Sequence, residues 1–409
     1  MKKTEHNIKN ISNKKTFLLC TAMLILFNNC VEEITFNDTS FDKLLVINAT
    51  ITDEYKIHEV TLSRISTLNA VADIDNYEKN AVVSILEDSQ ITHLFQEKTN
   101  GIYESIMPFK AELGKRYSLH ITTTDGEIYE SSLEEIQGVN DIDEVYAEPG
   151  TDYYGTEGIT IYAKSESSDK KAKYYKYTYK ETYKIIAPYF TIEALRIVSD
   201  VPPYKVEKYY HNEERQICYN TIASINILQA ETNSLSKNIA VKPIRFIKKN
   251  DSIIAHRYSI EVKQQVQSYE AYTYYSILSK FSTSESVFSQ TQQGFLQGNM
   301  VPTVNKNNKV VGYFEVNSVS KKRIFFNITD VFPDQYINTR KSCDTYAPKL
   351  IEANNPFSPL IDLLKAGFLY YEENGDRTMD NPGPYKIVQK RCGDCRVNGS
   401  IVKPNFWID

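Results

Sequence analysis

Short segments of alternating apolar and polar residues, separated by turn signals, fill the chain between residues 43 and 138. In Tyr117-Ser118-Leu119-His120-Ile121 the alternation would place apolar side chains on one face of a strand and His120 on the other. Asp125-Gly126 separates two such segments, and this dipeptide favours a tight hairpin turn. The predicted strands in this range are Leu44–Thr52, His58–Arg64, Ala81–Asp88, Thr92–Glu97, Gly101–Ser105, Arg116–Thr123 and Ile128–Leu133.

This density of strands and turns restricts the fold of the first part of the chain. About seven short strands in roughly 100 residues fit an immunoglobulin-like or transthyretin-like β-sandwich. The range contains no segment that requires a helix. We therefore expect residues 43–138 to form a β-sandwich domain.

Residues 139–409 are expected to form a larger, β-rich second domain. Alternation continues over Lys173–Ile186, where we expect a strand with a bulge near Glu181. Thirty tyrosines against one tryptophan agree with a fold dominated by strands, which tyrosine favours. The other predicted strands are Gly158–Ser165, Arg245–Lys249, Arg257–Gln267, Val310–Val319 and Lys322–Thr329.

Three segments of the second domain depart from the strand pattern. Ser268–Phe281 has apolar residues at helical spacing and is predicted to be one amphipathic helix. Gln290–Asn308 is a long polar loop, and loops of that length often have a function. Residues 330–409 are expected to be loop-rich and held in place by cysteines.

The first 29 residues have the pattern of a secretory signal peptide. Five lysines precede an apolar run, Phe17–Phe27, of about eleven residues. A bilayer core requires roughly 20 apolar residues, so the run is too short to anchor the chain by itself.

Cys30 follows this run almost directly, as the lipidated cysteine of a bacterial lipoprotein does. We expect Cys30 to be acylated and to become the first residue of the mature chain. Such a cysteine carries several acyl chains, which is enough for a stable membrane anchor. The alternative is an ordinary signal peptide with Cys30 as a plain thiol. With Cys30 as the lipidated residue, residues 30–42 form a linker to the first domain. Glu32-Glu33 in this linker is either an export tag for the cell surface or a solvated spacer.

The other cysteines of the mature chain are candidates for disulfides. Four cysteines in an exported protein are typical of two disulfides, with three possible pairings. Cys392-Gly-Asp-Cys395 also has the spacing of a redox or zinc pair, but the residues after it are typical of a loop rather than of a helix. The disulfide candidates are Cys218, Cys343, Cys392 and Cys395.

Net charge excludes some classes of partner. The chain has 47 Lys and Arg against 52 Asp and Glu, and the signal peptide contains five lysines and one glutamate. Its removal leaves 42 against 51, a net charge of −9. A protein this acidic is not expected to bind nucleic acid or to adhere electrostatically to anionic lipid.

Eleven stretches, in order along the chain, resemble a family of Bacteroidota outer-membrane lipoproteins catalogued as domain of unknown function four-two-four-nine. The resemblance implies an N-terminal β-sandwich, a lipid anchor and association with a TonB-dependent transporter, but no established activity and no functional residues. The stretches are LLVINATITDE, NAVVSILED, GIYES, GKRYSLHITTTDGEIYES, DIDEV, YYKYTYKETY, CYN…SINI, RYSIEVKQ…YEAYTYY, GN, VVGYFEVNSVSKKRIFF and CGDCR…KPNFW.

Motifs for catalysis or cofactor binding are missing from the sequence. It contains no HExxH, GxSxG, P-loop or GxGxxG. The acidic residues of Asp73–Asn76 and Asp141–Glu144 have a spacing that calcium accepts, but neither continues into an EF-hand, so we interpret both as loop acids. We expect neither cofactor nor metal.

The expected function is a non-catalytic binding or assembly module of the cell envelope, with a ligand that the sequence does not specify. The alternatives are a structural or adhesion protein and a surface hydrolase with paired carboxylates.

Overall fold

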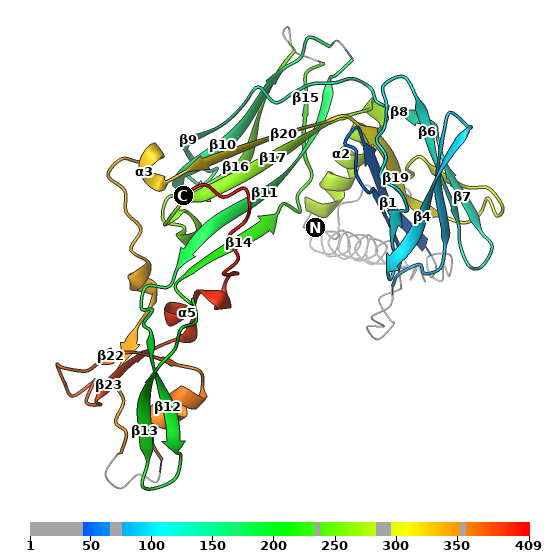
Figure 1. The fold of residues 1–409 in the computed structure, drawn as a ribbon. Helices are drawn as coiled ribbons and strands as arrows, with labels where there is room; N and C mark the ends of the chain where they lie inside the picture. Colours follow the sequence, from blue (N-terminus) through cyan, green and yellow to red (C-terminus); the bar gives the residue numbers. More distant parts are fainter. Residues whose placement is uncertain (1–43, 66–75, 170, 234–237, 284–295, 352–356) are drawn as a thin grey trace, which may run out of the picture. The chain divides into compact units, whose positions relative to one another are not determined.

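Strands make up most of the regular structure of this computed structural model, which confirms the predicted mainly β fold (Figure 1). The structure describes residues 44–65, 76–169, 171–233, 238–283, 296–351 and 357–409. The signal peptide, Cys30 and the linker lie outside these ranges. Within them, no helix is both long enough and apolar enough to cross a membrane.

Ten strands of the described residues form the first sheet, in the order β18-β7-β6-β3-β4-β5-β2-β1-β19, with β8 paired to β6. All seven strands predicted before residue 138 are present in it. In β6 the predicted apolar face is buried, since Tyr117, Leu119 and Ile121 are buried while the His120 side chain is 29% exposed. The strands are β1 Leu44–Thr52, β2 Glu59–Ile65, β3 Val82–Glu87, β4 Ile91–Thr99, β5 Ile102–Ser105, β6 Arg116–Thr122, β7 Ile128–Ser131, β8 Glu134–Glu135, β18 Met300–Pro302 and β19 Val310–Asn317.

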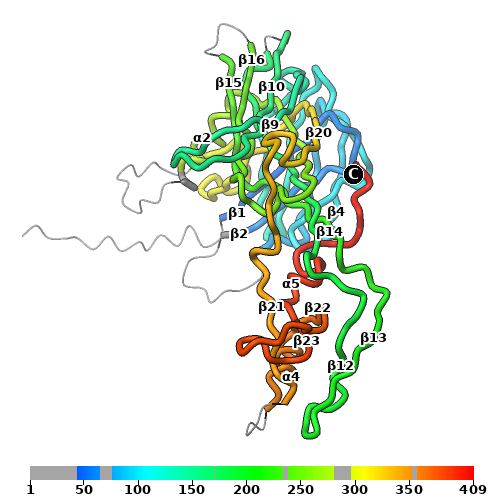
Figure 2. Tube along the Cα trace, turned by 90° about the vertical axis from the view of Figure 1, so that its left-hand side faces the viewer, coloured from blue at the N-terminus to red at the C-terminus, as the bar shows by residue number. Residues whose placement is uncertain are grey.

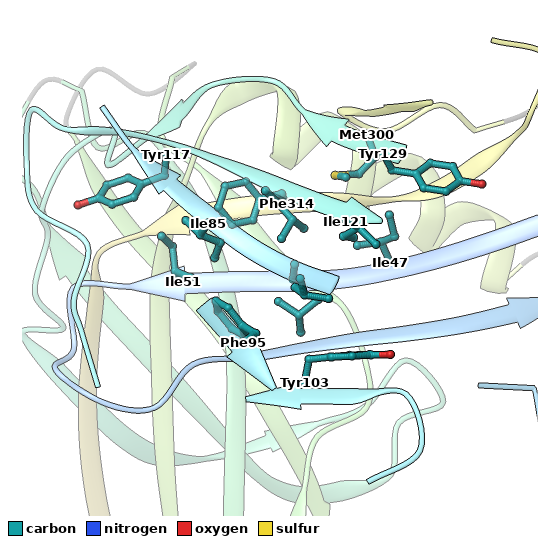
Figure 3. Close-up of a cluster of buried hydrophobic side chains, with 14 of the residues drawn as sticks. Ile47, Ile51, Ile85, Phe95, Tyr103, Tyr117, Ile121, Tyr129, Met300 and Phe314 are labelled. Carbon is teal, nitrogen blue, oxygen red and sulfur yellow. The ribbon is translucent and has the colours of Figure 1, made fainter. Parts of the chain in front are cut away.

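A single cluster of buried apolar side chains belongs to this sheet (Figure 3). Phe314 of β19 lies among side chains of β1, β3 and β6, and its own side chain is fully buried. Residues more than 200 positions apart in the sequence therefore complete one core. Burial of this apolar area is the main favourable term that holds β19 against the earlier strands.

The position of β18 and β19 corrects two expectations from the sequence. Both lie in the range that we assigned to a second domain, yet β19 pairs in parallel with β1 from Leu45↔Val310 to Thr52↔Asn317. Residues 300–302 were expected within a polar loop, but β18 pairs with β7. Pairing between such distant segments leaves no local signal in the sequence.

Asn299 joins the two ends of the first sheet. Its side-chain oxygen accepts a hydrogen bond from the backbone N–H of Phe314 at 2.8 Å, and its Nδ2 donates to the Phe314 carbonyl at 2.9 Å. The side-chain amide of Asn299 thus supplies the hydrogen bonds for the backbone N–H and carbonyl of Phe314 that a neighbouring strand would otherwise supply. Gly312 permits the close pairing of β19 with β1, because a Cβ at this position would lie 2.2 Å from the carbonyl oxygen of Ile47.

Two further sheets share a second hydrophobic core. One sheet has the order β14-β11-β17-β20 with β15 paired to β11, and the other has the order β16-β10-β9. Buried tyrosines of β11 and isoleucines of β10 and β16 contribute to the same cluster. The strands are β9 Glu144–Thr151, β10 Glu157–Glu166, β11 Tyr174–Ile186, β14 Ile217–Ala223, β15 Leu228–Glu231, β16 Ile239–Lys248, β17 Tyr258–Gln267 and β20 Val319–Phe326.

The predicted bulge near Glu181 was wrong. The pairing of β11 with β17 runs without a shift from Tyr174↔Gln267 to Tyr183↔Tyr258. Glu181 therefore stays in register and is 5% exposed. Its carboxylate accepts hydrogen bonds from the Tyr258 hydroxyl at 2.6 Å and from Arg245 Nε at 3.0 Å. These partners compensate the cost of burying the charge, which the sequence pattern alone did not indicate.

The predicted helix is confirmed as α2, Tyr269–Thr283, and the Tyr274 ring centroid lies 5.5 Å from that of Tyr313 on β19.

Residues 330–409 are more regular than expected, because they contain a three-stranded sheet, β21-β23-β22, beside the hairpin β12–β13 (Figure 2). The remaining elements are β12 Glu193–Ser199, β13 Lys205–Tyr210, η2 Ser252–Ile254, α3 Ile328–Val331, η3 Thr339–Ser342, β21 Thr345–Tyr346, α4 Pro359–Lys365, β22 Leu369–Glu373, β23 Tyr385–Val388, α5 Lys390–Gly393 and η4 Cys395–Val397.

His58 should make the fold sensitive to moderate acid. Its side chain is 1% exposed, Nε2 lies 3.0 Å from the Phe109 carbonyl oxygen, and Nδ1 is buried without a partner among the described residues. Burial lowers the pKa of His58 from 6.5 to about 4. As pH falls, His58 is therefore protonated at higher pH in the unfolded chain than in the folded chain, which favours unfolding. We expect the free energy of unfolding to decrease by about 2–4 kcal/mol between pH 6.5 and 4.

Urea unfolding at a series of pH values measures this dependence. The control is His58→Phe, which removes the titrating group and keeps an aromatic ring at the site. Burial also lowers the pKa of His256, so a smaller slope of the same sign should remain in the variant. An unchanged slope in His58→Phe would contradict the assignment.

Candidate functional site

Two disulfides join the four described cysteines. Cys218 of β14 is bonded to Cys395 of η4, and Cys343, just after η3, is bonded to Cys392 of α5. The structure thus supports one of the three pairings that the sequence left open. Both cysteines of the Cys392-Gly-Asp-Cys395 segment bond to distant partners rather than to each other, which does not fit a redox pair.

The Cys218–Cys395 disulfide attaches the C-terminal segment, residues 330–409, to β14 of the five-stranded sheet, whereas the Cys343–Cys392 disulfide lies within that segment. Cys218 and Cys395 are fully buried in a small apolar cluster with Ala187, against which Ile185 packs. Backbone hydrogen bonds reinforce this attachment, because the Cys395 N–H donates to the Arg215 carbonyl and the Ser400 N–H donates to the Tyr219 carbonyl. The position of the segment is therefore specified by covalent, apolar and polar contacts together.

A cavity of about 590 Å³ lies between this segment and the sheet. Such a volume is within the range of natural sites for small molecules. Cys343 lines the cavity, so one of the two disulfides forms part of its wall. The lining residues are Tyr183, Lys184, Ile185, Ile186, Pro188, Asn220, Ser252, Ile253, His256, Thr339, Ser342, Cys343, Arg391, Val397 and Asn398.

A second hollow of about 510 Å³ shares three of these residues: Lys184, Ile186 and His256. It adds Arg257, Asn327 and Asp409. Because the two hollows have lining residues in common, we treat them as one feature and call it the basic groove, defined by the two sets of lining residues.

The charged residues of the basic groove are mostly basic. Lys184 Nζ lies 3.5 Å from the Asp409 carboxylate, and Arg391 donates to the Gln389 side chain at 3.0 Å and to the Ser342 carbonyl at 3.2 Å. Burial, and then the nearby charge of Lys184, lowers the pKa of His256. The imidazole is therefore neutral at pH 7. Among the described residues that line the larger hollow, none is acidic.

Polar uncharged groups complete the groove. Asn220 Nδ2 donates to the Tyr183 hydroxyl at 2.9 Å, which orients both side chains. Ser252, Thr339 and Asn398 add hydroxyl and amide groups to the wall. Fixed cations, amides and hydroxyls can hold a polar solute by hydrogen bonds and charge.

The sequence identified only part of this site. It indicated the four cysteines but not the residues that they bring together, since Lys184, His256 and Arg391 come from three separate segments. No local motif marks any of the three. Cys30 lies outside the described residues, so its acylation stays a prediction.

Other groups considered from the sequence do not form a metal centre in the described ranges. Those ranges contain no group of three His, Cys, Asp or Glu side chains that could hold a metal ion. Asp141 and Asp143 are exposed, whereas Asp73–Asp75 lies outside the described residues. His93 is paired with Glu87 at 2.9 Å and is stacked on Phe109.

Comparison with known proteins identifies the family of the chain. A family model described as Domain of unknown function (DUF4249) matches residues 31–323. The matched range includes the first sheet and the strands that form one wall of the basic groove, whereas Cys343, Cys392 and Cys395 follow it. No curated protein matched the chain. Since the match extends over more than half of the chain, this protein belongs to the family described as Domain of unknown function (DUF4249).

Proposed function

We propose that this protein is a lipid-anchored module of the outer membrane, which binds a solute or stabilises an assembly beside a TonB-dependent transporter and carries out no catalysis. The observation that supports solute binding is the basic groove. Its volume suits a small molecule, and the Cys218–Cys395 disulfide connects the C-terminal segment that forms one wall to the sheet that forms the other. A rigid, preformed pocket loses little conformational entropy when a ligand binds.

The proposed location rests on the N-terminal sequence. A basic stretch, a short apolar run and Cys30 follow one another in the order of a lipoprotein signal. The family match begins at Val31, directly after Cys30. Disulfides form and persist outside the cytosol, which agrees with an exported protein. Several acyl chains on one cysteine would hold the folded part at the membrane surface.

The anchor and the partner can be tested in one preparation. The full-length protein is solubilised from membranes in mild detergent, and copurifying proteins are identified by mass spectrometry. We expect acylated Cys30 at the N-terminus and a β-barrel transporter in the complex. In a Cys30→Ala variant the protein should leave the membrane fraction and lose the transporter. An unmodified Cys30, or recovery without any β-barrel protein, would contradict the proposal.

A further inference from the structure

We infer that the basic groove binds an organic anion, a solute that carries a carboxylate or phosphate group together with hydroxyl groups. This inference rests on the proposed binding function and names the ligand class of the same site. It follows from the charges that line the groove, from their few counter-ions and from the polar groups between them.

Two arginines of the basic groove have no carboxylate partner among the described residues. Arg391 donates to the neutral oxygens of Gln389 and Ser342. Arg257 donates through Nε to the Ile408 carbonyl, and its guanidinium lies 5.4 Å from the centroid of the Phe325 ring. In the described part of the chain, both guanidinium groups thus contact neutral oxygens or an aromatic ring rather than a carboxylate.

Lys184 has a weak and shared counter-ion. Its Nζ lies 3.5 Å from Asp409, but the same carboxylate accepts a hydrogen bond from Lys403 at 2.6 Å. The Lys184 side chain is 22% exposed, whereas that of Asp409 is 58% exposed. Water therefore screens the carboxylate more than the ammonium group. Three cations with one shared carboxylate leave the groove with excess positive charge.

This excess is unusual in an acidic chain. The whole sequence has a net charge of −5, and several other lysines and arginines are paired closely with carboxylates, such as Arg245 with Glu181. A concave site of opposite sign to the whole protein concentrates field lines and attracts anions. A bound carboxylate or phosphate would supply the missing negative charge through charge-assisted hydrogen bonds.

The uncharged lining indicates what accompanies the anionic group. Asn220, Ser252, Thr339 and Asn398 offer donors and acceptors that match sugar hydroxyls. His256 lines both hollows, and its Nε2 is buried without a partner among the described residues. A neutral imidazole nitrogen can pair with a hydroxyl as donor or acceptor. Acidic sugars combine all of these features.

Isothermal titration calorimetry on the full-length protein in mild detergent tests the inference. The probes are trigalacturonate for carboxylates, glucose 6-phosphate for phosphates and maltotriose as the neutral comparison. We expect at least one anionic probe to bind about tenfold or more tightly than maltotriose. Raising NaCl from about 50 to about 500 mM should weaken that binding several-fold.

Charge variants separate recognition from stability. Lys184→Gln and Arg391→Gln should each weaken binding of the anionic probe about tenfold. Asp409→Asn removes the competing carboxylate and should strengthen binding about two- to fivefold. A purely structural role of Asp409 would not produce tighter binding. Lys98→Gln, which replaces a lysine of β4 with a 62% exposed side chain, is the control and should leave binding unchanged.

The results distinguish the inference from the proposed function. Binding of trigalacturonate alone assigns a carboxylate ligand, and binding of glucose 6-phosphate alone assigns a phosphate ligand. Equal or tighter binding of maltotriose, or Lys184 and Arg391 variants that bind as the parent does, would overturn the inference. Copurification with a β-barrel does not depend on these outcomes. If one variant fails to fold, the other and the Asp409→Asn variant still decide the question.

Discussion

Replacing Lys176 with methionine is expected to lower the free energy of unfolding by about 3–5 kcal/mol. Lys176 of β11 forms an ion pair with Glu315 of β19, so this contact connects the five-stranded sheet to the first sheet. The Glu315 side chain is 0% exposed. Without the lysine its carboxylate would keep only neutral partners among the described residues: Gln267 at 2.8 Å, Asn317 at 3.0 Å and the Tyr275 hydroxyl. An unpaired buried charge is costly, and urea unfolding at pH 7 measures that cost.

The matched control for this variant is an exposed ion pair between a basic residue and a glutamate. Arg196→Met breaks the pair with Glu207, whose side chains are 65% and 36% exposed, and should cost about 0–1 kcal/mol. The double variant Lys176→Met with Glu315→Gln removes both charges and should recover much of the loss. A loss below about 1 kcal/mol for Lys176→Met alone would show that the pair is not buried in solution.

The same pair predicts a response to strong acid. Burial alone would raise the pKa of Glu315, but Lys176 and the amides of Asn317 and Gln267 outweigh it, so the pKa lies below 4.5. Because the folded value is depressed, the contribution to stability is present above about pH 4.5 and is lost as pH falls through the folded pKa. This loss begins at lower pH than the loss caused by His58, so the two can be separated.

Removal of the Cys218–Cys395 disulfide should also have a large effect. The two residues are 177 positions apart, and the chain-entropy model then gives a stabilisation of about 5 kcal/mol, at the upper end of the measured range. We expect the double variant Cys218→Ala with Cys395→Ala to lose about 2–5 kcal/mol in urea unfolding under oxidising conditions. Because the C-terminal segment forms one wall of the basic groove, anion binding should weaken as well.

The second disulfide provides the comparison. Cys343 and Cys392 are 49 positions apart, for which the same model gives about 4 kcal/mol, so its removal should cost about 1 kcal/mol less. With a reducing agent present, parent and variants should converge in stability. A parent protein that is equally stable with and without the reductant would contradict both assignments.

Thirteen of the 23 strands of the described residues were predicted, because alternation is a local property. Side chains of a strand point to alternate faces, so a strand with one buried face shows this pattern in its own residues. The same holds for α2, whose apolar residues recur at helical spacing. Glu181 shows the limit of this signal, since a buried carboxylate looks like an interruption until its partners Arg245 and Tyr258 are known.

The partners of each strand were not predictable in the same way. β19 was identified as a strand, but its parallel pairing with β1 depends on contacts between residues about 265 positions apart. The disulfide pairing and the basic groove depend on such contacts too. Lys184, His256 and Arg391 are unremarkable in sequence, and only the attachment of the C-terminal segment to β14 brings them to one cavity.

The sequence by itself therefore determined the mainly β class, more than half of the described strands, the helix α2 and the expectation of an exported, disulfide-bonded protein. Local periodicity, turn residues and cysteine number carry that information within short windows. Tertiary structure decided which strands pair, which cysteines bond and where positive charge collects. Those outcomes depend on energies between distant residues, such as the burial of Glu315 beside Lys176, and no short window of sequence contains both partners.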